Sequence, residues 1–140
     1  MVASATVLFV TLCGAVSVRA ADYPELKVEK LLVSSSAYNG QPLAYLEGKH
    51  PEVTAMTVTI PPGGETGWHR HPVPVYAYVM EGELTVELKN ERKYRFTKGE
   101  VILEVRETPH NGRNTGTDPT KLLVFYTGSS GIPNVIREVP

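Results

Sequence analysis

The chain has 140 residues, with 14 Lys and Arg against 15 Asp and Glu and a formal net charge of −1 at pH 7. This length predicts a single domain, and an apolar content of 41% is ordinary for a globular protein. A chain so close to neutral gives no electrostatic reason to expect nucleic acid or an anionic membrane surface as a partner.

The first twenty residues differ in character from the rest. An apolar run that ends at Leu12 is followed by small residues, and the tripeptide that ends at Ala20 has the small-x-small pattern of a cleavage site. We therefore expect a signal peptide over residues 1–20 and a periplasmic or secreted domain over residues 21–140. The run is shorter than the roughly 20 apolar residues of a spanning helix, so no other membrane association is expected. Because no Lys or Arg precedes the run, an uncleaved anchor stays open, and Cys13, the one cysteine, lies inside this segment.

Alternation of apolar and polar residues predicts strands in most of the remaining chain. Residues 53–60 (VTAMTVTI) and 83–89 (ELTVELK) have the period of two that is typical of half-buried strands. Residues 101–105 (VILEV) and 121–126 (KLLVFY) are more continuously apolar and could be buried on both faces. Turn signals such as the PPGG run at 61–64 separate these segments. The layout predicts an all-β sandwich or barrel.

Two segments are harder to assign. Residues 27–36 (KVEKLLVSSS) could form an edge strand that pairs within the chain or with a second subunit. Residues 131–140 (GIPNVIREVP) have too little periodicity to be placed.

Histidines give the chain its candidate chemistry. His69 and His71, on either side of Arg70, share one face if this stretch is a strand, because strand side chains alternate. In a closed barrel, His110 can converge with them at the mouth, where small-molecule sites tend to form. Three imidazoles suit a transition metal with positions left open for a substrate. Spacing alone is weak evidence, since paired histidines in strands are often plain polar residues, and His50 is interpreted as a surface residue.

Two motifs strengthen this interpretation. The first comprises Gly63, His69, His71 and Gly82, and the second comprises Gly99, His110 and Asn114. In order and spacing they resemble the two motifs of the cupin superfamily, in particular the small single-domain "cupin 2" type. The resemblance implies a double-stranded β-helix, that is, a jelly-roll barrel, in which the three histidines bind a metal.

The chain departs from this family at the fourth metal ligand. Cupins usually supply a glutamate that is separated from the second histidine by three or four residues, and at these two positions this chain has Val75 and Tyr76. A three-histidine site, a site completed by another side chain and a barrel without a tightly bound metal all remain open. The candidates for an additional ligand are Tyr76, Tyr78, Glu104 and Glu65. Strict alternation from His71 sends both tyrosines to the face opposite Val75, which counts against them.

Trp68, directly before His69, could line a pocket at the barrel mouth or pack under the preceding turn. A divalent ion held by three neutral imidazoles keeps its full charge and favours an anionic ligand. The sequence therefore indicates an exported metal-binding cupin that acts on a small carboxylate- or carbonyl-type molecule.

The kind of activity is left open. An enzyme of this type would be a metal-dependent oxygenase, isomerase or lyase, and the alternative is a non-catalytic barrel that binds a small ligand or a metal. The cofactor expected is a divalent transition metal, Fe, Ni, Cu, Zn or Mn, because imidazole accepts several of them. The resemblance also implies a homodimer, and protection of edge strands makes one physically reasonable.

Overall fold

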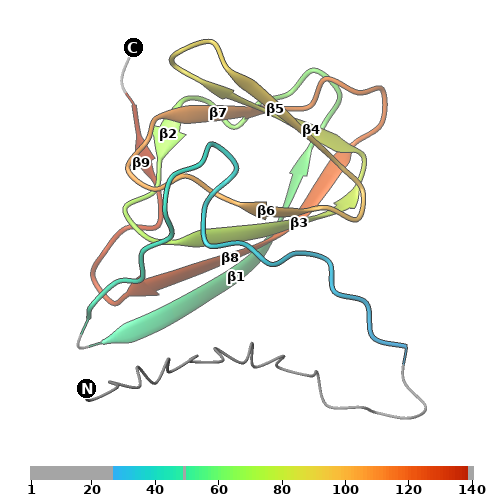
Figure 1. The fold of residues 1–140 in the computed structure, drawn as a ribbon. Coiled ribbons are helices and arrows are strands. Elements are labelled where there is room, and N and C mark those ends of the chain that lie inside the picture. The colour runs from blue at the N-terminus through green and yellow to red at the C-terminus, as the bar shows by residue number, and fades with distance from the viewer. Residues whose placement is uncertain (1–26, 49, 139–140) are drawn as a thin grey trace, which may run out of the picture.

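The protein is described by a computed structural model that covers residues 27–48 and 50–138, so the expected signal peptide lies outside the described residues (Figure 1). Within these ranges the strands are β1 (Pro51–Ile60), β2 (His69–Arg70), β3 (Val75–Glu81), β4 (Glu83–Leu88), β5 (Lys93–Thr97), β6 (Val101–Leu103), β7 (His110–Arg113), β8 (Thr120–Ser129) and β9 (Ile136–Arg137). None of the described segments is a helix long and apolar enough to cross a membrane.

The strands form two antiparallel sheets that face each other (Figure 1). One sheet has the order β1-β8-β3-β6 and the other the order β5-β4-β7-β2-β9. β1 and β8 pair along their whole length, from Pro51 opposite Ser129 to Ile60 opposite Thr120. Since most neighbours within a sheet are distant in sequence, the chain passes repeatedly from one sheet to the other. This arrangement confirms the predicted all-β jelly-roll barrel.

The core lies between the two sheets and is built by alternate residues of the strands. β3 buries Val75, Ala77 and Val79, and the facing β4 buries Leu84 and Val86. The other buried members of this cluster are Ile60, Val73, Ile102, Leu122, Val124 and Tyr126. Complete burial of one such aliphatic side chain is worth about 1.5–3 kcal/mol. The period-two patterns read from the sequence thus correspond to real inward and outward faces.

Burial on both faces, which the apolar run at 121–126 left possible, is wrong. In β8 the buried residues alternate, so Leu123 and Phe125 point away from the core, and Phe125 keeps 40% of its surface exposed. β6 buries only Ile102 of its three residues. The outer face of the β1-β8-β3-β6 sheet is therefore partly apolar, with side chains such as Phe125 partly exposed.

The two segments that the sequence left unassigned take different forms. Residues 27–34 form no strand, and the only β-bridge described for residues 27–46 joins Ser36 to Pro42. Tyr38 then packs into the barrel, with its ring centroid 4.7 Å from that of Tyr94. The tail contributes β9, which pairs with β2.

The connection between β3 and β4 passes from one sheet to the other through Gly82. Its φ of +70° is a left-handed conformation that glycine adopts without steric cost. A Cβ at this position would also lie 2.6 Å from the backbone oxygen of Pro119. Both the backbone angle and the space therefore require glycine here.

Asn114, at the end of the second motif, braces the loop between β7 and β8. Its side chain is fully buried, and its amide nitrogen donates to the backbone oxygens of Ile60 and Asp118 at 2.9 and 2.8 Å. Its side-chain oxygen accepts from the backbone N–H of Gly116 at 2.9 Å. Asn114 is thus a structural residue that ties this loop to the end of β1.

Candidate metal centre

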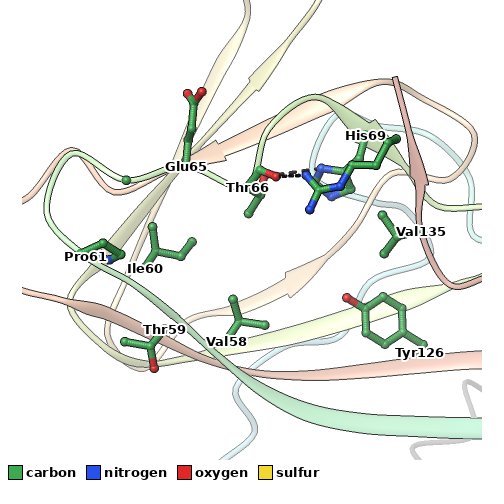
Figure 2. A pocket seen from close by; sticks show the side chains of 11 residues that line it. Val58, Thr59, Ile60, Pro61, Glu65, Thr66, His69, Tyr126 and Val135 are labelled. Carbon is green, nitrogen blue, oxygen red and sulfur yellow. Dashed lines mark hydrogen bonds between the residues drawn. The ribbon is translucent and has the colours of Figure 1, made fainter. Parts of the chain in front are cut away.

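A pocket of about 420 Å³ opens beside the end of β1 and reaches His69 (Figure 2). Figure 2 shows Val58 and Tyr126 on one side of it and Thr66 and His69 on the other. These four residues also line a deeper cavity of about 60 Å³ between the sheets. The outer pocket is therefore a mouth, and the deeper cavity, which also holds the other two motif histidines, is its inner end.

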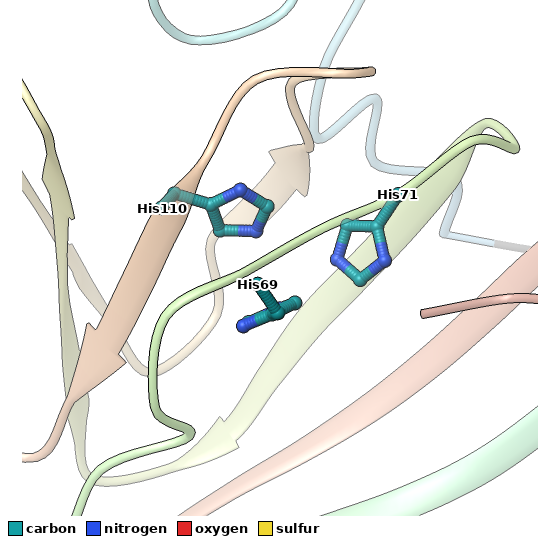
Figure 3. Close-up of side chains that lie close together, drawn as sticks. All are labelled: His69, His71 and His110. Atoms are coloured by element: carbon teal, nitrogen blue, oxygen red, sulfur yellow. The ribbon is translucent and has the colours of Figure 1, made fainter. Parts of the chain in front are cut away.

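The strand pairing explains why the three histidines meet. His69 of β2 lies directly opposite His110 of β7, and opposite residues of an antiparallel pair point to the same face. His71 lies two residues after His69 and so returns to that face. The rings lie close together in Figure 3, with centroid separations of 4.4 Å for His69–His110, 4.8 Å for His69–His71 and 5.0 Å for His71–His110.

Each imidazole is held by a backbone carbonyl through its Nδ1 atom. The Nδ1–oxygen distances are 2.7 Å from His69 to Gly67, 2.9 Å from His71 to Asn134 and 2.8 Å from His110 to Thr108. Because a carbonyl oxygen can only accept, Nδ1 carries the proton in each ring and Nε2 is left with a lone pair.

The free nitrogens have the properties of metal ligands. One ligand nitrogen from each ring can be chosen so that all three lie within 4.8 Å of one another. Nε2 of His110 is buried and has no hydrogen-bond partner among the described residues. Buried polar atoms are rarely left unpaired, and metal-binding histidines usually donate their other ring N–H to a carbonyl or carboxylate. The donor set therefore fits a transition metal.

Burial also keeps the three rings neutral. It lowers the pKa of His71 from 6.5 to about 3, and the hydrogen bond to Asn134 offsets this effect only in part. Burial lowers the pKa of His69 and of His110 in the same direction. Neutral imidazole is the form that binds a metal, so the site does not have to lose protons near pH 7.

Glu104 lies beside this cluster. One of its carboxylate oxygens, Oε2, is 3.7 Å from Nε2 of His110 and is buried without a hydrogen-bond partner among the described residues. Burial raises the pKa of Glu104 from 4.5 to about 7. Of the four additional ligands that the sequence offered, Glu104 is the one that lines the deep cavity.

The other sequence candidates lie elsewhere. Tyr76 and Tyr78 are half-buried and out of phase with Val75 and Ala77 of β3, which line the deep cavity. This is the placement that strand alternation predicted.

Trp68 and Glu65 are also outside the deep cavity. Trp68 packs under Lys89, whose Nζ lies 4.0 Å from the ring centroid, and it lines a separate surface pocket. Glu65 lines the mouth and pairs with Arg113 at 2.6 Å.

Sequence reasoning did not identify two residues of the site. Tyr126 lines both the mouth and the deep cavity, and its ring lies 5.7 Å from that of His71. Arg137 of β9 lines the mouth, and its guanidinium donates to the backbone oxygen of Thr66. Tyr126 has the parity of the buried residues Leu122 and Val124, which is a signal that the sequence contained, whereas nothing local marks Arg137.

The fold is a jelly-roll barrel, and three buried histidines, each held by a backbone carbonyl, converge inside it. The protein is therefore of the class of β-barrel proteins with a candidate metal centre. Residues 56–126 match the family model described as Cupin domain, and the chain therefore belongs to the cupin family. Comparison with curated proteins gave no significant match.

Solved structures with a similar fold include three enzymes. They are the DMSP lyase DddQ from Ruegeria pomeroyi (23% identity, TM-score 0.55, covering 72% of this chain and 48% of that one), oxalate decarboxylase of Lactobacillus farciminis in a formate complex (27%, 0.53, 61% and 26%) and the polyketide cyclase RemF from Streptomyces resistomycificus (23%, 0.51, 66% and 66%). This chain spans about half the length of the DMSP lyases that it matches. At these identities the lyase and the cyclase establish the fold alone.

Proposed function

We propose that the protein is an exported cupin that binds a divalent transition metal through His69, His71 and His110 and acts on a small carboxylate- or carbonyl-type molecule. The observation that carries the proposal is the shared orientation of the three rings, each with Nδ1 held by a carbonyl and Nε2 left free. A barrel core gains nothing from three convergent polar nitrogens unless something binds them.

The mouth supports an anionic substrate. Arg137 places a positive charge beside His69, and the guanidinium geometry is suited to carboxylates. The oxalate decarboxylase that this chain resembles in fold is described as a formate complex, so a related barrel accommodates a small carboxylate. We infer that Arg137 binds the carboxylate and directs the substrate toward the histidines.

The reaction proposed is that of a metal-dependent oxygenase, isomerase or lyase. A bound metal would supply Lewis acidity or activate oxygen. The chain itself contributes an apolar wall of Leu84, Val86, Leu122 and Val124, which excludes water from the cavity. The metal is one of Fe, Ni, Cu, Zn or Mn, all of which imidazole accepts.

One observation favours a second candidate, a non-catalytic barrel that binds a metal or a small ligand. The deep cavity of about 60 Å³ is well below the 300–1,000 Å³ that is typical of small-molecule sites. An enzyme of this form would therefore have to hold most of its substrate in the mouth.

A titration distinguishes these possibilities. Metal-loaded protein is titrated with oxalate, malonate and acetate, and oxygen consumption and product formation are followed in parallel. We expect binding that weakens about tenfold or more in Arg137→Gln, given the 1.5–3 kcal/mol of a charged hydrogen bond, and that is unchanged in the exposed control Arg92→Gln. Binding with turnover supports the enzyme, binding without turnover supports the second candidate, and no binding would overturn the substrate class.

Export and dimer formation are part of the same proposal. The leader-like residues 1–20 support export, which N-terminal sequencing of secreted or periplasmic protein would test. The outer face of the β1-β8-β3-β6 sheet is partly apolar and carries Val53 and Phe125, which are 65% and 40% exposed. An exposed apolar face of this kind supports a homodimer. Light scattering of the purified protein would measure its mass, and a monomer would contradict the dimer.

A further inference from the structure

Glu104 is an acidic residue in a place where a charge is costly. It follows β6 directly, and its side chain is only 10% exposed. Oε2 is buried and accepts no hydrogen bond from any described residue. A buried carboxylate normally has a cation or several donors as partners, because removing it from water is expensive.

In the part of the chain that the structure describes, no lysine or arginine forms an ion pair with Glu104. Among the described residues, the one basic side chain within 4.0 Å of the Glu104 carboxylate is the imidazole of His110, whose Nε2 is 3.7 Å from Oε2. Nε2 of His110 is also without a partner. Two unpartnered polar atoms thus face each other inside the barrel, and a cation between them would satisfy both.

The backbone explains how this carboxylate reaches the histidines. In the β3–β6 pair, Tyr76 lies opposite Leu103, and the N–H of Glu104 donates to the oxygen of Val75 at 3.0 Å. Glu104 therefore continues the ladder one step further, opposite Val75. Opposite residues of an antiparallel pair point to the same face, and both residues line the deep cavity.

We propose that Glu104 is the fourth protein ligand of the metal centre, supplied from the end of β6 instead of from β3. Val75 occupies one of the two positions at which the sequence motif would place a glutamate, and Glu104 is its neighbour across the ladder, about 5 Å away. The carboxylate would reduce the net charge of a divalent centre from +2 to +1. The inference rests on the proposed three-histidine site and adds a ligand to it.

The alternative ligands are less suited. Tyr76 and Tyr78 are out of phase with the side chains that line the cavity. Glu65 is committed to Arg113 at the mouth and is about 43% exposed. Glu65→Gln is therefore a matched control, since it removes a nearby carboxylate that does not face the histidines.

The test is made on the full chain, purified without a histidine tag and stripped of metal. Wild type, Glu104→Gln, Glu65→Gln and His110→Ala are titrated with cobalt(II), which reports its ligands through its absorption spectrum. Zinc affinity is measured in parallel by chelator competition. We expect Glu104→Gln to bind zinc at least about 100-fold more weakly, beyond the 10–100-fold typical of losing an outer-sphere partner. Its cobalt spectrum should change, while Glu65→Gln matches wild type.

An unchanged cobalt spectrum in Glu104→Gln, beside loss of binding in His110→Ala, would overturn the role of Glu104 and leave the three-histidine site standing. No cobalt or zinc binding in wild type would overturn the site itself. If circular dichroism shows that Glu104→Gln does not fold, the role of Glu104 is tested instead by the infrared difference spectrum of wild type with and without zinc. A zinc-dependent change in the carboxylate bands that persists in Glu65→Gln supports the proposal, and no change refutes it.

Discussion

The stability of the metal-free protein should depend on pH through two buried groups, His71 and Glu104, because burial shifts their pKa values in opposite directions. Burial lowers the pKa of His71 from 6.5 to about 3, so between these values the unfolded chain binds a proton that the folded chain does not. The stability from neutral His71 is complete above pH 6.5 and is lost as the pH falls. Burial raises the pKa of Glu104 from 4.5 to about 7. Its contribution is complete below pH 4.5 and is lost as the pH rises through 7.

These shifts set the size of the effect. At about 1.4 kcal/mol per pKa unit, each group changes the free energy of unfolding by about 2 kcal/mol between pH 7 and pH 5, with opposite signs. In wild type the two offset each other, and the lowered pKa values of His69 and His110 leave a net loss toward low pH. Glu104→Gln removes the contribution of Glu104 that opposes the contribution of His71. Over the same range this variant should lose about 2 kcal/mol more than wild type.

Urea unfolding in the presence of a chelator, at pH 5, 6 and 7, measures this difference. His50→Gln serves as the control, because it replaces a histidine that is exposed. Parallel loss of stability in wild type and Glu104→Gln would refute the reasoning, since it would mean that Glu104 does not take up a proton on folding in this range.

Two further predictions concern the frame that holds the site. Gly82→Ala should destabilise the protein by more than 1 kcal/mol, because the new Cβ would lie 2.6 Å from the oxygen of Pro119. Gly40→Ala, at φ +90° with open space around it, should cost less, and equal melting temperatures for the two variants would contradict the role of the close contact. Asn114→Ala should lower the free energy of unfolding by about 2–4 kcal/mol, since the buried backbone oxygen of Ile60 and the part-buried backbone groups of Asp118 and Gly116 lose their partner. A loss below 1 kcal/mol in denaturant unfolding would show that this brace is dispensable.

Much of the fold could be predicted because strand alternation is a local signal. The apolar residues of 83–89, Leu84, Val86 and Leu88, are all buried in β4, whereas in 53–60 Ile60 is buried, Val58 is half-buried and Met56 is exposed. The same alternation correctly sent Tyr76 and Tyr78 away from the cavity. The continuously apolar run at 121–126 left burial on both faces possible, because an outward aromatic residue such as Phe125 looks like a buried one in the sequence.

The three histidines could be recognised as candidates because their spacing follows a known motif, and β2 and β7 bring them together. From the sequence, Glu104 could be named as one of several candidates for an additional ligand, but it could not be distinguished from the others. Its placement depends on the register of β6 against β3, which is a pairing between segments distant in sequence. Arg137 could not be found at all, since it reaches the mouth only because the tail pairs with β2 as β9.

Metal content is the measurement that tests the central claim most directly. The untagged wild-type protein, His69→Ala and His110→Ala are purified together and analysed for Fe, Ni, Cu, Zn and Mn by mass spectrometry, before and after reconstitution. We predict near-stoichiometric binding of one of these metals in wild type and its loss in both variants, which retain the barrel by circular dichroism. A wild-type protein that holds no metal even after reconstitution would contradict the account.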